Sequence, residues 1–241
     1  MQRLVFDIET DNLYFECENL WIVAVKCLDT GEKRQWRPGE DGWKEVLSNA
    51  KLVVGHNVID FDLPALKKLT GFVLPKSVKV HDTLLLSLIL NYNREGGHKL
   101  ASWGLRLGYP KLEFEDFSKF TEEMLTYCIR DVDLTAKVYR ILLDEFDKIY
   151  EKSPQIATYV KAEHAVAKWC SMAKVHGWPF DIPAALELLG KLQAVVDESK
   201  AKLQPLLGMK TVPVDKKKGE VEFKILKWQK NGGYQQHTAN W

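Results

Sequence analysis

The 241-residue chain lacks several features that would assign it to a protein class at once. Its 34 basic and 33 acidic residues leave a formal net charge of +1, so net charge predicts no partner. A nucleic-acid-binding protein of this composition must gather its basic residues locally. No apolar run approaches the roughly 18 residues of a membrane span, and the N-terminus lacks a signal peptide's charged-then-apolar pattern. We therefore expect a soluble cytoplasmic protein with no membrane partner.

Cysteine is also scarce, with four residues at unrelated spacings and no Cys-x-x-Cys pair. This usage argues against a structural zinc site and against a disulfide framework. We expect Cys17, Cys27, Cys128 and Cys170 to be reduced, buried thiols. The chain is, however, 46% hydrophobic and 11% aromatic, which is enough for a folded core.

The order of strand and helix patterns predicts a mixed α/β domain that ends near residue 150. Apolar or alternating runs predict strands at 4–9, 20–28, 34–37, 51–55 and 78–80. Helical patterns occupy 41–50, 61–70, 83–90, 100–107 and a long stretch that begins after Thr121. Beyond residue 150 we expect helices at 159–176 and 184–207, then a lysine-rich tail that includes Lys216-Lys217-Lys218.

The first strand contains two carboxylates, Asp7 and Glu9, on either side of Ile8. Alternate residues of a strand share a face, so Asp7 and Glu9 point the same way. Two acids held together in a core repel each other and are costly to desolvate unless cations neutralise them. Taken alone, the pair fits a solvent-exposed strand end better than half of a magnesium site.

Three further polar residues lie at informative places. Asp62 opens a helix after a buried strand, where a helix N-cap is the simpler interpretation and Asp60 is a competitor. Tyr127 and Asp131 are four apart on the long helix, so they share a face, as a surface pair also would. Together, the acids and the tyrosine occur in an order and spacing that favour one shared site.

This order resembles the tyrosine branch of the DEDD superfamily of 3′-5′ exonucleases. The family's motifs Asp-x-Glu, Asn-x(2–3)-Phe/Tyr-Asp and Tyr-x(3)-Asp match Asp7 to Glu9, Asn57 to Asp62 and Tyr127 to Asp131. The resemblance implies a ribonuclease H-like mixed β-sheet flanked by helices, with a C-terminal helical extension.

Further segments narrow the resemblance to the proofreading exonuclease domain of T-odd-phage family A DNA polymerases. They are His56-Asn57, Asp82-Thr83-Leu84, Trp103 to Gly108 and His164 to Asp181. By this resemblance, residues 1–150 form the exonuclease domain, and residues 151–241 form a helical extension and tail that begin the polymerase region. The loop at 91–99 is shorter than in the phage enzymes, which puts a DNA contact there in doubt, and no polymerase motif is present.

The resemblance also implies roles for residues. Two Mg²⁺ ions, for which Mn²⁺ is expected to substitute, would be held by four carboxylates: Asp7, Glu9, Asp62 and Asp131. Asp7 would bridge both ions, Glu9 and Asp131 would hold the water-activating ion, Asp62 would act on the other, and Tyr127 would orient the water. Thr10, Leu13, Asn57 and Phe61 would bind substrate, although a turn residue and a core leucine are equally good interpretations of Thr10 and Leu13.

Other residues of interest have simpler structural interpretations. We expect Asp82 to cap its helix, His98 to lie in a surface loop, and Trp36 and Trp103 to pack in or near the core.

The implied activity is removal of nucleotides from single-stranded or frayed DNA 3′ ends, with release of nucleoside 5′-monophosphates. Its implied partners are single-stranded or primer-template DNA, the remainder of a polymerase chain and replisome proteins, in a phage-infected host or the bacterial cytosol. Two alternatives remain open. One is a free-standing DEDD exonuclease, including ribonuclease D-like RNA trimming, and the other is a non-catalytic interaction module of the same fold.

Overall fold

A computed structural model describes residues 2–207, 210–213, 221–224, 228–229 and 233–234. The chain divides into two compact units, Met1–Gly177 and Trp178–Trp241, and each is described by itself. The first unit therefore extends past residue 150, while the functional division expected there stays a prediction. The lysine run at 216–218 lies outside the described residues.

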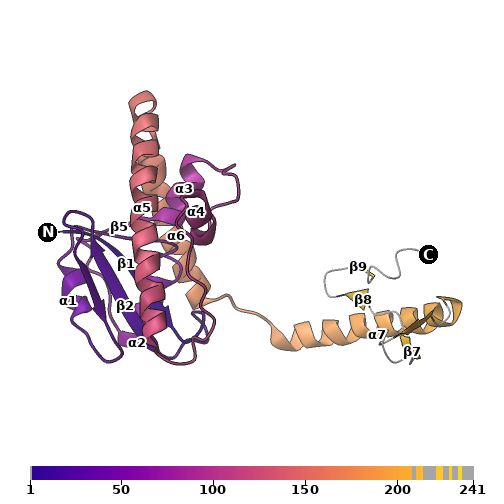
Figure 1. The fold of residues 1–241 in the computed structure, drawn as a ribbon. Coiled ribbons are helices and arrows are strands. Elements are labelled where there is room, and N and C mark those ends of the chain that lie inside the picture. The colour runs from indigo at the N-terminus through magenta and orange to yellow at the C-terminus, as the bar shows by residue number, and fades with distance from the viewer. Residues whose placement is uncertain (1, 208–209, 214–220, 225–227, 230–232, 235–241) are drawn as a thin grey trace. The chain divides into compact units, whose positions relative to one another are not determined.

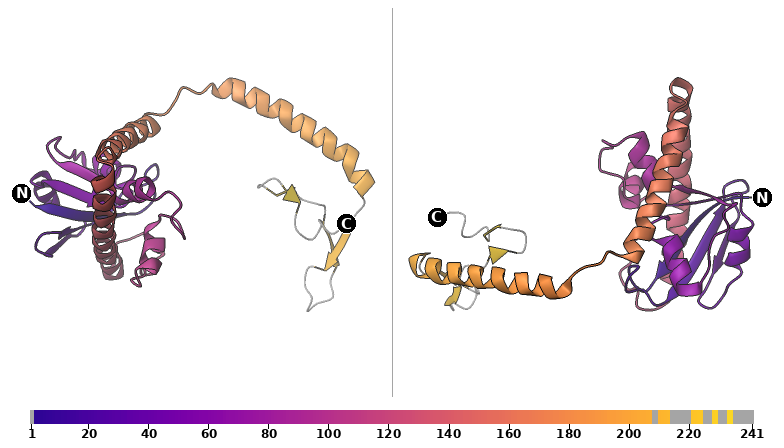
Figure 2. Two further views of the ribbon diagram at one scale, coloured as in Figure 1. Left: turned by 90° about the horizontal axis from the view of Figure 1, so that it is seen from above. Right: turned by 180° about the vertical axis from the view of Figure 1, so that it is seen from behind.

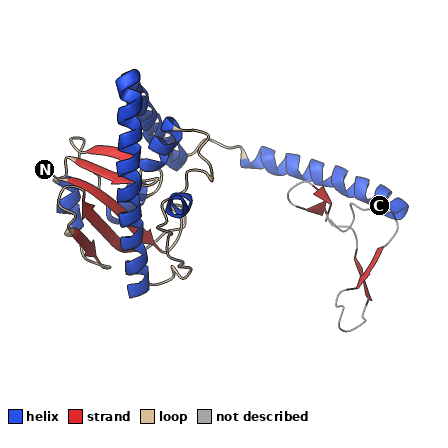
Figure 3. Ribbon diagram, turned by 45° about the horizontal axis from the view of Figure 1, so that its top comes forward, coloured by secondary structure: helices blue, strands red, loops and turns tan. Residues whose placement is uncertain are grey.

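A five-stranded mixed sheet forms the centre of the first unit (Figures 1 and 3). Its strand order is β3-β2-β1-β4-β5. The strands are β1 (Arg3–Thr10), β2 (Leu20–Cys27), β3 (Lys33–Trp36), β4 (Leu52–Gly55) and β5 (Lys79–Asp82). β2 is antiparallel to β1, whereas β4 is parallel to β1 and β5 to β4. The predicted ribonuclease H-like mixed sheet is confirmed.

Helices cover both faces of this sheet, and the long helix α5 crosses one of them (Figures 1 and 2). Strand alternation sorts the core, because Leu4, Phe6 and Ile8 pack on one face while Val5 packs on the other. The first face is covered by α1 (Trp43–Ser48) and α2 (Asp62–Thr70). The second is covered by α3 (Thr83–Leu90), α4 (Leu100–Arg106) and α5 (Glu122–Lys152).

The start of α5 is fixed by its predicted cap, since the Thr121 hydroxyl accepts a hydrogen bond from the Met124 N–H at 3.1 Å. The helix buries an apolar stripe that includes Val132, Ala136 and Tyr139. α6 (Ile156–His176) follows and ends at Gly177, whose φ of +74° favours glycine.

In the second unit, α7 (Ile182–Leu207) leads to two short hairpins. They are formed by β6 (Lys210–Pro213) with β7 (Val221–Lys224), and by β8 (Trp228–Gln229) with β9 (Gly233–Tyr234). None of the described helices is both long and apolar enough to cross a bilayer.

The four cysteines are all free, but one of them departs from the prediction. Cys17, Cys27 and Cys128 are buried, as expected, whereas Cys170 is exposed. Cys170 lies on α6, most of whose residues remain accessible to solvent, so an apolar residue there need not face a core.

Candidate metal centre

The site is built on β1, because Asp7 and Glu9 follow Val5 on the face that packs against α5. Glu9 is only 8% exposed, and Asp7 is partly buried. The register of β1 with β2 shifts between Glu9 and Thr10, so the regular pairing of β1 is interrupted directly after the two acids. The alternative interpretation of Asp7 and Glu9 as a solvent-exposed strand end is therefore wrong.

Asp62 comes near enough to Asp7 to raise its pKa because β4 runs parallel to β1. Val5 pairs with Val54, so the chain that leaves Gly55 emerges beside the next residues of β1. A Cβ on Gly55 would lie 2.7 Å from the Cβ of Val58, and the turn that follows therefore needs glycine. Asp62 opens α2 at 3% exposure without acting as its cap.

Asp60 does not compete with Asp62 for this place. Its carboxylate pairs with the Lys174 ammonium at 2.9 Å, with both side chains close to half exposed.

The turn before Asp62 is anchored by Asp82. The Asp82 carboxylate accepts hydrogen bonds from the backbone N–H groups of Asn57 and Ile59 at 2.9 and 3.1 Å, and from that of Leu84 at 2.9 Å. Asp82 thus caps α3, as predicted, and also fixes the turn. Asn57 has a φ of +67°, a left-handed conformation that asparagine tolerates better than most residues.

Tyr127 and Asp131 approach from α5, one helical turn apart. Asp131 is 3% exposed, and Tyr127 is half-buried against Phe114 and Phe117. Between them, the buried thiol of Cys128 lies 3.9 Å from Asp7 Oδ2. Among the described residues, Asp131 Oδ1 is one of two buried side-chain polar atoms without a hydrogen-bond partner.

Burial raises the pKa values of all four acids, and neighbouring carboxylates of the centre add to the shift for Asp7 and Glu9. Burial, and then repulsion from neighbouring carboxylates, raises the pKa values of Asp7 and Glu9 well above the usual range. Burial raises the pKa of Asp62 to about 7 and also raises that of Asp131. This concentration of buried negative charge is a strained arrangement until cations neutralise it.

Lys111 is the site residue that sequence reasoning missed. Its Nζ pairs with Asp131 Oδ2 at 2.5 Å and lies 4.9 Å from the centroid of the Tyr127 ring. Burial lowers the Lys111 pKa, but the Asp131 carboxylate outweighs it and holds that pKa above its ordinary value. The loop that carries Lys111 has neither helical nor strand periodicity, so the sequence holds no signal that places it here.

The donor set fits a hard divalent ion. One ligand atom each from Asp7, Glu9 and Cys128 lies within 4.8 Å of the others. Burial, and then the nearby Asp7 carboxylate, raises the Cys128 pKa well above its usual value, so this thiol stays protonated and is not a good ligand. The available ligands are then carboxylate oxygens, including the unpartnered Asp131 Oδ1, and Mg²⁺ and Mn²⁺ prefer such oxygens.

The predicted substrate-binding residues follow β1 or lie in the turn before α2, and they differ in their burial. Thr10 is buried and its hydroxyl donates to the Asn12 carbonyl at 2.7 Å, as a turn residue would. Leu13 is 74% exposed, so it is not a core leucine. Asn57 and Phe61, at the two ends of the turn before α2, are both partly buried.

The two tryptophans for which we expected a structural role are packed as predicted, whereas His98 differs in part. Trp103 is 1% exposed, and Trp36 packs against the core on the α1 side of the sheet. His98 is less free than a surface-loop histidine, because its two ring nitrogens contact Ser87 Oγ and the Tyr92 carbonyl.

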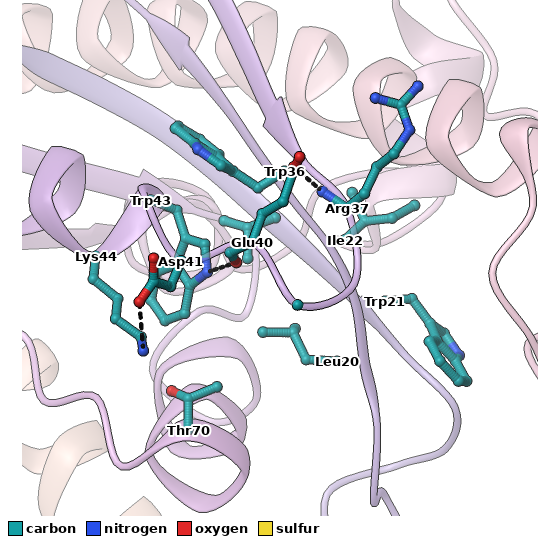
Figure 4. Close-up of a pocket in the computed structure, with 12 residues that line it drawn as sticks. Leu20, Trp21, Ile22, Trp36, Arg37, Glu40, Asp41, Trp43, Lys44 and Thr70 are labelled. Atoms are coloured by element: carbon teal, nitrogen blue, oxygen red, sulfur yellow. Dashed lines mark hydrogen bonds and ion pairs between the residues drawn. The ribbon is translucent and has the colours of Figure 1, made fainter.

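A separate pocket of about 160 Å³ contains none of the site carboxylates. Figure 4 shows Trp36 and Trp43 beside it, with Arg37, Glu40 and Lys44 at its edge. Two of its polar groups are already engaged, since Trp43 Nε1 donates to the Glu40 carbonyl and the Arg37 backbone N–H donates to the Glu40 carboxylate. It carries no constellation comparable to the carboxylate centre.

Comparison with known proteins finds relatives among phage polymerases, although no protein-family model matches the chain. The chain is 30% identical to the DNA-directed DNA polymerase of Enterobacteria phage T3, over 79% of this chain and 35% of that protein. It is 28% identical to the DNA-directed DNA polymerase of Escherichia phage T7, over 85% of this chain and 37% of that protein. The chain thus spans about a third of the length of these relatives.

Among solved structures, the fold is similar to that of Brucella melitensis NrnC, in a structure with bound Mg²⁺. The match has a TM-score of 0.59 at 18% identity and covers 76% of this chain and 90% of that chain. At 18% identity, this likeness shows the fold alone.

Proposed function

We propose that the chain is a 3′-5′ proofreading exonuclease of the DEDD type, because it is similar to the phage T3 and T7 DNA polymerases and shares its fold with a nuclease. It would hydrolyse single-stranded or frayed DNA 3′ ends to nucleoside 5′-monophosphates as part of a replicative phage polymerase. One observation carries the proposal: Asp7 and Glu9 on β1 present ligand atoms within 4.8 Å of each other, beside the buried carboxylates of Asp62 on α2 and Asp131 on α5.

The proposed reaction assigns each group a task. Two divalent ions, when bound, would activate the attacking water and stabilise the leaving 3′-oxygen. Asp7, Glu9, Asp62 and Asp131 would hold them. Tyr127 would orient the water as a neutral phenol, because burial raises its pKa further above neutrality.

Proofreading would follow from access to the centre. A mismatched end unpairs at lower free-energy cost than a matched one, so it would reach the carboxylates more often. Leu13, exposed just beyond β1, supports this proposal because an apolar side chain there is free to pack against a terminal base. Partners would be primer-template DNA, the remaining polymerase chain and replisome proteins in the infected host.

Replacing Asp7 tests the assignment directly. Asp7→Ala is expected to lower the rate of single-stranded DNA degradation in Mg²⁺ by at least about a hundredfold, because charge stabilisation of this kind is worth that much. Its melting temperature without metal should stay close to that of the wild type, since one repelling carboxylate is removed.

Asp60→Ala is the matched control, because this nearby acid lies outside the centre. It should keep both the rate and the melting temperature. Wild-type turnover by Asp7→Ala would overturn the proposed mechanism.

A free-standing DEDD exonuclease that trims RNA is the second candidate, since NrnC shares the fold over most of its own length. Brucella melitensis NrnC has also been solved bound to pGG. Matched single-stranded DNA and RNA oligonucleotides separate the two candidates. We expect faster release of nucleotides from DNA, and a clear preference for RNA would favour the second candidate.

A non-catalytic module is opposed by the presence of all four acids and the tyrosine. Mn²⁺ titrations test it through the melting temperature, which should rise if the carboxylates hold ions. An unchanged melting temperature together with no nuclease activity would favour the module.

A further inference from the structure

Lys111 places a positive charge inside the carboxylate centre. Its Nζ lies 2.5 Å from Asp131 Oδ2, and the side chains of Lys111 and Asp131 are 25% and 4% exposed. The ammonium is close enough to oppose the charge of Glu9 and Asp7 as well. Among the described residues, Lys111–Asp131 has the least exposed carboxylate of the ion pairs, so solvent screens it little.

The loop between α4 and α5 that carries Lys111 is held in place. The Pro110 carbonyl accepts a hydrogen bond from Arg130 Nε at 3.0 Å, and Arg130 directly precedes Asp131. Further along the loop, the Phe117 carbonyl accepts a hydrogen bond from Trp21 Nε1 at 2.9 Å. Lys111 is therefore delivered to Asp131 by a fixed backbone.

One ammonium cannot neutralise four acids. Asp131 Oδ2 is paired with Lys111, while Asp131 Oδ1 is buried without a partner. A buried carboxylate with one paired and one free oxygen is suited to a second cation. Lys111 and a divalent ion would then share Asp131, and each would lower the site's attraction for the other.

We propose that Lys111 is a built-in counter-cation, which keeps the metal-free centre assembled and competes with the incoming ion for Asp131. This inference rests on the proposed metal-dependent function and deepens it. The carboxylates would stay in place without metal, whereas the affinity for the ion would be lower than four unopposed acids would give.

Lys111→Met, with a side chain of similar length and no charge, tests the competition on the full chain. Without metal, its melting temperature should fall by several degrees because the acids lose their counter-charge. Its Kd for Mn²⁺, measured by titration calorimetry, should fall by about tenfold because no cation opposes the ion. The Mn²⁺ concentration for half-maximal activity should shift down in parallel. Lys111→Arg should retain the wild-type melting temperature.

Lys26→Met is the matched control. Lys26 on β2 pairs through its Nζ with Asp133 Oδ1 at 2.6 Å. Asp133 lies on α5, as Asp131 does, but outside the centre. This variant should lower the melting temperature without changing the Kd for Mn²⁺.

Two results would overturn the counter-cation role. If wild type binds Mn²⁺ while Lys111→Met binds it equally or more weakly, the role fails and the metal centre stands. If wild type binds no Mn²⁺, the metal centre and the counter-cation role both fail.

Discussion

Asp62 differs from its half-exposed neighbour Asp60 because it is buried at the start of α2. Burial raises its pKa from 3.8 to about 7, so the folded chain keeps a proton that the unfolded chain loses. Between pH about 4 and about 7 the folded state then binds more protons than the unfolded state. By linkage, this group makes the metal-free protein less stable as pH rises through that window.

Asp62→Asn should remove this contribution. In EDTA, the variant should match the wild-type free energy of unfolding near pH 4 and exceed it increasingly up to pH about 7.5, as measured by urea unfolding. The quantity to compare is the difference in free energy of unfolding between variant and wild type at each pH. This is because burial lowers the pKa values of His56 and His81 to about 4, so these groups make both proteins more stable as pH rises. Parallel pH profiles would contradict the assignment.

Leu13 is the residue for which sequence reasoning left two interpretations and the structure removes one. At 74% exposure it contributes little to the core, so Leu13→Ala should leave the melting temperature unchanged. If it packs against the terminal base, the KM for single-stranded DNA should rise roughly fivefold, which corresponds to about 1 kcal/mol of lost contact. Val73→Ala, at a residue 64% exposed, is a control that should change neither quantity.

An unchanged KM in Leu13→Ala would leave the exposed leucine without a part in substrate binding.

At the scale of elements, the turn between β4 and α2 depends on Asp82. Asp82→Ala would leave the N–H groups of Asn57 and Ile59 without their acceptor and would uncap α3. We expect a loss of about 3 kcal/mol in the free energy of unfolding, as for other buried groups left unpaired. Activity should fall too, because Asp62 loses its anchor.

The contrast with Asp7→Ala distinguishes an anchor from a metal ligand. Asp82→Ala should lose stability and retain measurable Mn²⁺ binding through Asp7 and Glu9, while Asp7→Ala should show the reverse pattern. Full stability in Asp82→Ala would contradict the anchoring role.

The elements were predictable wherever periodicity or capping specifies them. The apolar run of β2, the Thr121 cap of α5 and the end of α2 at Thr70 all lie where the sequence indicated. Strand alternation and helical spacing made it predictable that Asp7 shares a face with Glu9 and Tyr127 with Asp131, while the gathering of these pairs with Asp62 came from the resemblance. Lys111 was not, because its loop follows neither period and its position depends on contacts with α5 that are distant in sequence.

At the scale of the whole molecule, α6 packs with the first unit although it follows the predicted end of the exonuclease domain. His164 links them, because its Nε2 accepts a hydrogen bond from the Asp82 backbone N–H at 3.0 Å while its Nδ1 donates to the Val160 carbonyl at 2.8 Å. The turn that carries Asp62 is therefore supported from α6 through Asp82.

This support predicts where the chain can be shortened. A chain that ends at Gly177 retains α6 and should keep the melting temperature and Mn²⁺ affinity of the first unit, because the two units divide there. A chain that ends at Ser153 loses His164 and leaves the Asp82 N–H without its acceptor. Its melting temperature should fall clearly below that of the longer chain, by several degrees, and its Mn²⁺ affinity should weaken. Equal stability of the two chains would mean that α6 does not support the centre.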